Sequence, residues 1–403
     1  MTPAERRASG SLAFVFAARM LGLFLVLPVF ALEAARYPGG GDPAMVGLAM
    51  GIYGLTQGLL QIPYGMASDR FGRKKVIVIG LLVFAAGSFV AAAAPTLGWL
   101  LVGRSLQGAG AVSAAVTALL ADQTRDSVRT KAMAMVGASI GLMFALSLVA
   151  APLLAAGIGL HGLFVITGVL ALGCIAVVLW WTPPAPAQRA NLPRGRLADV
   201  LRHPALLRLD VGVFVLHAVQ LAMWVAIPAL LVEAGLDKEA HWKVYLPTVL
   251  ASFVVMGAVL FPLERRGYLR AVFLSAVGLV LLVQVGLWAT AAQPGLVALS
   301  ILLFLFFCGF NVLEATQPSL ASRVAPQQSR GAALGVYNTL QSLGFFAGGA
   351  VGGWLAKNVG GSGLFGACAA LMLVWLVVAW PMRAPQAARQ TAEEVLADEA
   401  QAT

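Results

Sequence analysis

Long apolar segments with few charged residues alternate with short polar loops along almost the whole chain. Each segment has about 17–25 residues, the length an α-helix needs to cross a bilayer. The segments are continuous and lack the period-two alternation of barrel strands, so helices are favoured over a barrel. Twelve transmembrane helices are therefore predicted, at approximately residues 11–33, 45–67, 76–94, 97–121, 132–155, 161–181, 209–233, 244–263, 271–291, 295–318, 331–356 and 361–382.

An internal repeat divides these segments into two sets of six. The segment PVFALEA at 28–34 is matched by PALLVEA at 228–234, and the loop that follows the second helix has a counterpart 195 residues later. Both copies enter the membrane from the same side, which is typical of parallel repeats. We predict an all-α membrane protein with a six-helix half at 1–181, a Pro-rich basic linker at 182–208, a second half at 209–382 and a tail at 383–403.

Composition agrees with lipid as the main solvent. Of the 403 residues 60% are apolar and 11% are charged, and the mean hydropathy is +0.87. A soluble protein carries roughly 25% charged residues, so a soluble enzyme, a disordered chain and a disulfide scaffold are excluded. The three cysteines lie in apolar runs without metal-ligand spacing, and no hydrolytic or nucleotide-binding motif occurs. We expect no enzyme activity, no metal and no cofactor.

The distribution of the net charge of +10 indicates how the chain is oriented in the membrane. Of the 27 Lys and Arg residues, 21 fall in one set of alternate loops and four in the other. Because cytoplasmic loops carry the excess of Lys and Arg, both termini are predicted to be cytoplasmic. The charge therefore indicates a lipid bilayer as partner and not a nucleic acid.

The loop between the second and third predicted helices has a dense signature, GMASDRFGRKK at 65–75. Gly72 suits a tight turn, and Asp69 sits among four cations with which a carboxylate can pair. This loop resembles the signature of the major facilitator superfamily. The resemblance implies a cytoplasmic latch between the halves, with Asp122 as a partner carboxylate, formed by Gly65, Asp69, Arg70, Gly72, Arg73, Lys74 and Asp122.

Further segments are similar to the drug:proton antiporters of this superfamily, and most of all to YajR-type transporters. These are RMLG at 19–22, GIYGLTQ at 51–57 and TKAMA at 130–134. The segment RSLQGAGA at 104–111 is similar to a motif of the whole superfamily that carries a membrane-embedded arginine. The resemblance implies a monomer that works by alternating access, and a chain too short for the soluble C-terminal domain of many such relatives. The glycine-rich antiporter motif of the fifth helix is degraded, which keeps other transport modes open.

Charged groups inside the predicted helices are the candidate functional residues, because a charge at a helix centre costs about 2.5–3.5 kcal/mol. His217 lies nine residues from Arg208, and Glu314 lies nine residues from Arg323, which places both at a similar depth. We predict Glu314 and His217 as proton carriers, unless they serve only as structural hydrogen-bonding groups.

Two cations complete this set. Arg104 belongs to a family-like motif and is assigned to proton coupling by that resemblance. Arg19 lies in the first helix, where it is expected either to hold an anionic substrate or to pair with Glu314. Glu33 and Glu233 lie near the outer ends of their helices and are expected to be solvated rim residues.

Polar and aromatic side chains at helical spacing suggest a substrate cavity between the halves. The alternative is that they form interhelical hydrogen bonds, worth about 0.6 kcal/mol each. Beside Arg19, the candidates are Tyr53, Gln57, Gln61, Gln107, Gln220, Trp224, Asn311, Gln317, Tyr337, Asn338 and Gln341.

These observations predict a multi-pass secondary transporter of a bacterial inner membrane. Proton-coupled efflux of drug-like or amphiphilic small molecules, driven by the proton gradient, is the first hypothesis. A metabolite or sugar-type symporter or uniporter of the same fold is the alternative. A receptor or a polytopic enzyme is a third.

Overall fold

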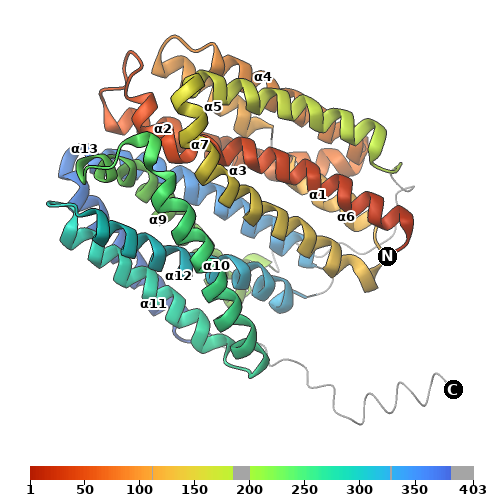
Figure 1. The fold of residues 1–403 in the computed structure, drawn as a ribbon. Helices are drawn as coiled ribbons and strands as arrows, with labels where there is room; N and C mark the ends of the chain where they lie inside the picture. Colours follow the sequence, from red (N-terminus) through yellow and green to blue (C-terminus); the bar gives the residue numbers. More distant parts are fainter. Residues whose placement is uncertain (111, 185–199, 327–328, 383–403) are drawn as a thin grey trace.

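A computed structural model describes residues 1–110, 112–184, 200–326 and 329–382. Most of the predicted linker and the whole predicted tail lie outside these ranges. The described residues form helices joined by short connections (Figure 1). Their bounds up to the linker are α1 (Pro3–Phe24), α2 (Leu27–Ala34), α3 (Pro43–Phe71), α4 (Arg73–Ala92), α5 (Leu97–Ala109), α6 (Ser113–Asp122), α7 (Asp126–Ala176) and η1 (Val177–Trp181).

The second series of helices begins at Pro204, five residues before the predicted start of the seventh segment. Proline is favoured in a first helical turn because its missing N–H needs no partner there. The helices are α9 (Pro204–Glu233), η2 (Lys238–Ala240), α10 (Trp242–Arg265), α11 (Leu269–Thr290), α12 (Leu296–Val324) and α13 (Arg330–Ala379).

Glycines with positive φ divide the two longest helices. Gly159 in α7 has φ of 61° and Gly360 in α13 has φ of 70°, a conformation that glycine adopts without strain. Each of these elements therefore contains two helices that meet at a sharp corner. By length and apolar composition, the described ranges hold nine candidate spans, and those in α7 and α13 each combine two predicted segments. Every predicted apolar segment has a helical counterpart.

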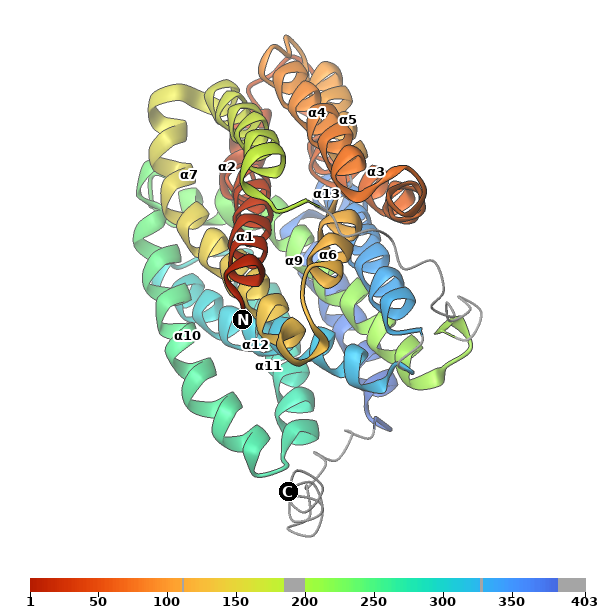
Figure 2. The same cartoon turned by 90° about the vertical axis from the view of Figure 1, so that its right-hand side faces the viewer.

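The elements before and after the linker form two adjoining groups. In Figure 1, α1–α7 occupy the upper part and α9–α12 the lower part, and Figure 2 shows α4–α5 and α10–α12 on opposite sides of the molecule. Between the groups, α3 packs along α13, with further contacts of α2 with α9 and of α7 with α10.

The α3–α13 contact is close because both helices present glycines. A methyl group on Gly47 or Gly54 would overlap backbone carbonyl oxygens of α13, at Gly349 and Ser342 respectively. On α13, a methyl group on Gly353 would lie 2.6 Å from the Pro43 carbonyl oxygen. Small residues of this kind allow helices in membranes to approach closely.

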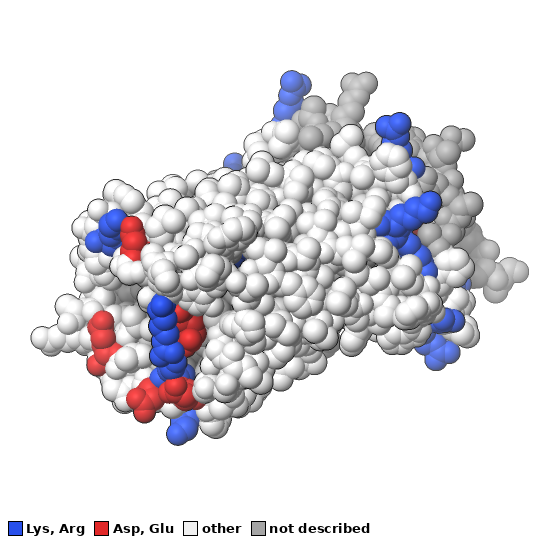
Figure 3. Space-filling model, turned by 90° about the horizontal axis from the view of Figure 1, so that it is seen from above, with Lys and Arg blue, Asp and Glu red and all other residues white. Residues whose placement is uncertain are grey.

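The outer surface has the polarity of a membrane protein. Charged side chains gather at the two ends of the elongated body and leave a nearly uncharged band between them (Figure 3). Large apolar side chains such as Val254, Leu282 and Val297 are 67–73% exposed. Such exposure costs little when the surrounding solvent is lipid.

Candidate functional site

The predicted proton carriers contact each other. His217 Nε2 on α9 lies 3.3 Å from Glu314 Oε2 on α12, and Gln341 Nε2 on α13 lies 2.8 Å from the same imidazole nitrogen. Gln341 also donates to Glu314 Oε1 at 3.4 Å. Three helices thus bring a histidine, a carboxylate and an amide together at one level.

The contacts fix where a proton can sit. His217 Nδ1 lies 2.8 Å from the Val213 carbonyl oxygen, which can only accept, so Nδ1 carries a hydrogen. In the neutral imidazole the Nε2 lone pair accepts from the Gln341 amide, while Glu314 Oε2 lies 3.3 Å from the same nitrogen. A proton added to Glu314 would let its carboxyl group donate to this nitrogen. The Glu314 side chain is 38% exposed and that of His217 is 2% exposed, so Glu314 is the accessible partner.

A second buried carboxylate, Asp210, is not among the candidates from the sequence and falls at the edge of the predicted segment 209–233. It is 3% exposed and its Oδ2 has no hydrogen-bond partner among the described residues. Seven residues separate Asp210 from His217, so both lie on one face of α9. The Tyr337 hydroxyl likewise has no hydrogen-bond partner within the described ranges, and it lies within electrostatic range of both Glu314 and Asp210.

Arg19 forms no contact with Glu314. Its guanidinium donates to Ser113 Oγ at 2.7 Å, to the Tyr53 hydroxyl at 2.8 Å and to Gln57 Oε1 at 3.0 Å. The side chain is buried, and among the described residues these three hydrogen-bond partners are all neutral. The sequence left two roles open for Arg19, and the pairing with Glu314 is absent from this conformation.

Arg104 occupies an adjoining buried position. It donates to Gln107 Oε1 at 2.8 Å, and its guanidinium lies 4.9 Å from the centre of the Tyr53 ring. Gln107 in turn donates to Ser88 Oγ at 2.8 Å. Tyr53 therefore touches both arginines, one through its hydroxyl and the other through its ring face.

One hydrogen bond links Gln57, a partner of Arg19, to α13. Gln57 Nε2 donates to Ser342 Oγ at 3.0 Å, and Ser342 is the neighbour of Gln341 in the chain. The polar groups of the two predicted halves therefore approach each other where α3 packs on α13.

Aromatic side chains lie beside this junction. Phe144 of α7 makes edge contacts with Phe24 of α1 and Phe307 of α12, at ring separations of 5.1 and 6.1 Å. Phe310 lies 6.1 Å from the His217 ring. Phe310 thus borders the His217 ring, and Phe144 of the first predicted half packs against Phe310 at 6.4 Å.

The remaining candidates for the substrate cavity are more scattered. Asn311 donates to Ser252 Oγ, and Trp224 packs edge-on against Tyr245. Gln61, Gln220 and Gln317 are at least 97% buried, each with an amide atom that lacks a partner among the described residues. Asn338 is half-buried, and its backbone carbonyl accepts from Ser342.

The signature loop is organised around Arg73. This side chain contacts Asp69 at 2.5 Å and Asp122 at 2.9 Å, and it donates to Ser68. Gly72 has φ of 99°, which requires glycine at this turn.

The other members of the loop have simpler surroundings. Arg70 lies over the ring of Phe71, and Lys74 donates to the Thr182 carbonyl oxygen. A methyl group on Gly65 would make an ordinary contact with Ala114 at 3.8 Å, so packing does not demand glycine there.

Two ion pairs at the opposite end join the predicted halves. Lys238 Nζ lies 2.7 Å from Glu33 Oε1, and Lys357 Nζ lies 2.7 Å from Asp42 Oδ2. The expectation that Glu33 is a solvated rim residue is wrong, because Glu33 is 6% exposed and Lys238 covers it. The hydrogen bond from Lys357 holds the pKa of Asp42 below its ordinary value.

Sequence and structure comparisons agree with this description. The model of the Major Facilitator Superfamily matches residues 12–349 and 322–400. The chain is 43% identical over 389 residues to the inner membrane transport protein YajR of Escherichia coli K12, covering 96% of this chain and 85% of YajR. It is 29% identical over 354 residues to the multidrug resistance protein MdtH of Aeromonas salmonicida, covering 83% and 84% of the two chains.

Solved structures have the same fold at low sequence identity. The human organic anion transporter MFSD10 aligns with a TM-score of 0.69 at 18% identity, covering 94% of this chain and 100% of that one. A mutant form of the nucleoside transporter NupG aligns with a TM-score of 0.73 at 13% identity, covering 93% and 99%.

Proposed function

Because the chain belongs to the major facilitator superfamily, whose members are secondary transporters and not enzymes, we propose that it exchanges protons for drug-like or amphiphilic small molecules. It is a multi-pass transport protein of the bacterial inner membrane. Export would proceed by alternating access, with the predicted halves rocking about a site between them. The energy would come from the proton gradient, in which each charge gains about 2.3 kcal/mol per 100 mV.

The observation that carries this proposal is the 3.3 Å contact between His217 and Glu314. A proton added to Glu314 would allow a hydrogen bond to His217, and the Glu314 side chain is 38% exposed. In the outward-open state the pair would take up a proton as substrate leaves. In the inward-open state it would release the proton as the next substrate arrives.

Asp210 and Tyr337 support a route for the released proton. Both lie closer than the His217–Glu314 pair to the helix ends predicted to be cytoplasmic, and each has a buried oxygen atom without a partner among the described residues. A proton leaving Glu314 could pass the Tyr337 hydroxyl to reach the Asp210 carboxylate.

The test is proton-driven transport in proteoliposomes with ethidium as the probe. Glu314→Gln should abolish uptake driven by an imposed pH gradient but retain ethidium counterflow, which needs no net proton movement. The matched control is Glu233→Gln, because Glu233 is exposed at the end of α9. Unchanged proton-driven transport in Glu314→Gln would remove this residue from coupling.

One observation favours the alternative, a symporter or uniporter for a metabolite that carries an anionic group. Arg19 is buried and its hydrogen-bond partners are neutral, so an anion carried by the substrate would supply the missing countercharge. Counterflow of aromatic carboxylates and of matched cationic amines, with and without a pH gradient, separates the two functions. Preference for carboxylates that is lost in Arg19→Gln and retained in Arg19→Lys would establish the alternative.

A further inference from the structure

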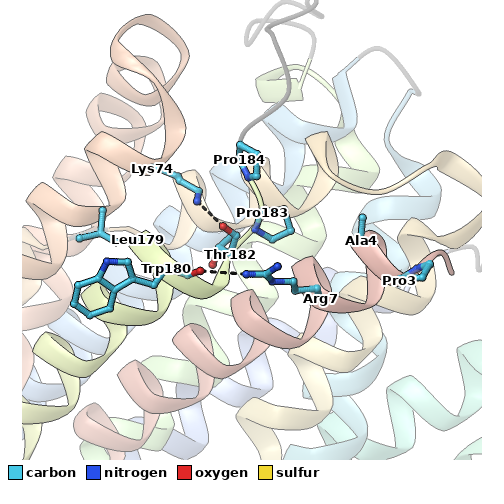
Figure 4. Close-up of a pocket in the computed structure, with 9 residues that line it drawn as sticks. All are labelled: Pro3, Ala4, Arg7, Lys74, Leu179, Trp180, Thr182, Pro183 and Pro184. Carbon is cyan, nitrogen blue, oxygen red and sulfur yellow. Dashed lines mark hydrogen bonds between the residues drawn. The ribbon is translucent and has the colours of Figure 1, made fainter.

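A hollow of about 540 Å³ lies far from the central polar groups, where α1, α4 and the end of η1 meet (Figure 4). Its wall includes the cations Arg7 and Lys74, the side chains of Leu179 and Trp180, and the prolines Pro3 and Pro183. It lies at the end of the molecule that bears the signature loop, which is predicted to be cytoplasmic.

Backbone carbonyls hold both cations in the hollow. Arg7 donates through Nε to the Trp181 carbonyl oxygen at 2.6 Å and through Nη2 to that of Trp180 at 3.1 Å. Lys74 donates to the Thr182 carbonyl oxygen at 2.5 Å. These contacts cap the C-terminal end of η1, yet they use only part of the capacity of five guanidinium and three ammonium hydrogens.

The positive charge in the hollow has no carboxylate countercharge among the described residues. The nearby acids contact other cations: Glu5 binds Arg125 at 2.8 Å, and Asp69 and Asp122 bind Arg73. Arg7 and Lys74 are close enough for their like charges to repel each other. An anion placed between the two cations would relieve this repulsion.

We propose that this hollow binds the phosphate group of an anionic phospholipid. Arg7 and Lys74 have free donors that suit phosphate oxygens. A lipid is favoured over a soluble phosphate because Trp180 and Leu179 are 78% and 51% exposed beside the cations. Tryptophan is typical of the headgroup level of a bilayer, and basic hollows between transmembrane helices on the cytoplasmic side recognise lipid headgroups. The bound lipid joins α1, α4 and η1.

The test measures lipid retention by native mass spectrometry. Protein from nanodiscs containing equal amounts of phosphatidylglycerol and phosphatidylcholine should retain phosphatidylglycerol preferentially. The double variant Arg7→Gln/Lys74→Gln should lower this retention about tenfold. The control is Arg6→Gln, since Arg6 is exposed but does not line the hollow. Equal retention by the double variant and the wild type would overturn the proposal.

A charge-preserving double variant and a competition with inorganic phosphate complete the test. Arg7→Lys/Lys74→Arg preserves both charges and should keep retention near the wild-type level, even if the neutral double variant does not fold. Inorganic phosphate at millimolar concentration should not displace the lipid. Displacement by phosphate without any preference for phosphatidylglycerol would assign the hollow to a soluble phosphate and contradict a lipid site.

Discussion

The two ends of the molecule are held together in different ways. At the end predicted to face outward, Lys238–Glu33 and Lys357–Asp42 join one predicted half to the other. At the opposite end, the ion pairs seen among the described residues, of Arg73 with Asp69 and Asp122 and of Arg125 with Glu5, lie within the first half. Glycine packing between α3 and α13 adds to the outer contact.

This difference indicates which part of the molecule must separate during transport. Contacts between halves have to break when access alternates, whereas contacts within a half can persist. We infer a conformation closed on the outer side, in which the half-buried Glu314 would be reached from the other side. Changes to the outer contacts should therefore shift the conformational equilibrium, and changes to the inner ion pairs should shift it much less.

The largest effect is expected from Gly47→Leu. A side chain on Gly47 meets the backbone of α13, so α3 and α13 can no longer approach at the outer end. We expect transport to fall by more than tenfold and the outer ends to separate. Spin labels introduced through Gly41→Cys and Ala292→Cys would report the separation.

The matched control for this change is Gly257→Leu on α10. Nothing lies within 4 Å of a methyl group built on Gly257, so the added side chain finds open space there. Equal loss of transport in both variants, without a change in the label distance of Gly47→Leu, would contradict a role of the α3–α13 contact in closure.

The next effect is expected from Glu33→Gln. The change removes the buried Glu33 carboxylate that joins the two halves through Lys238, and leaves Lys238 with only Glu239 at 3.8 Å. Loss of one member of a buried pair is costly, and we expect the closed-to-open ratio to fall about tenfold, equivalent to about 1.4 kcal/mol. The same spin-label pair measures this ratio. An unchanged distance distribution would show that Lys238–Glu33 does not hold the outer end closed.

The outer contacts also show what the sequence could and could not predict. The apolar segments were visible because a membrane-spanning helix needs a long apolar run, and the equal depth of His217 and Glu314 followed from their distances to basic residues. The burial of Glu33 depends on Lys238, which is 205 residues away in the chain. No local pattern contains that information, and the same holds for the packing of α3 on α13 and for the partners of Arg19.

A smaller effect on the outer end is expected from Asp122→Asn. This change removes one of two carboxylates from Arg73 and keeps Asp69, and all three residues lie in the first half. The spin-label distances at the outer end should stay as in the wild type, while thermal unfolding should show a destabilisation of about 1 kcal/mol or less. An outer end that opens in this variant would break the distinction between contacts within and between the halves.

The smallest effect at neutral pH concerns Asp42 and Lys357. Because the hydrogen bond from Lys357 lowers the pKa of Asp42, the pair contributes fully above the ordinary carboxyl pKa of 3.8 and is lost as pH falls through the lowered value. Because Asp42 stays charged between pH 5 and pH 8, the contribution of this pair to closure of the outer end should not change in that range. Below about pH 4 the wild type should open slightly more at the outer end, whereas Asp42→Asn should already be in that state at neutral pH. Spin-label distances that change with acid equally in both proteins would assign the response to another group.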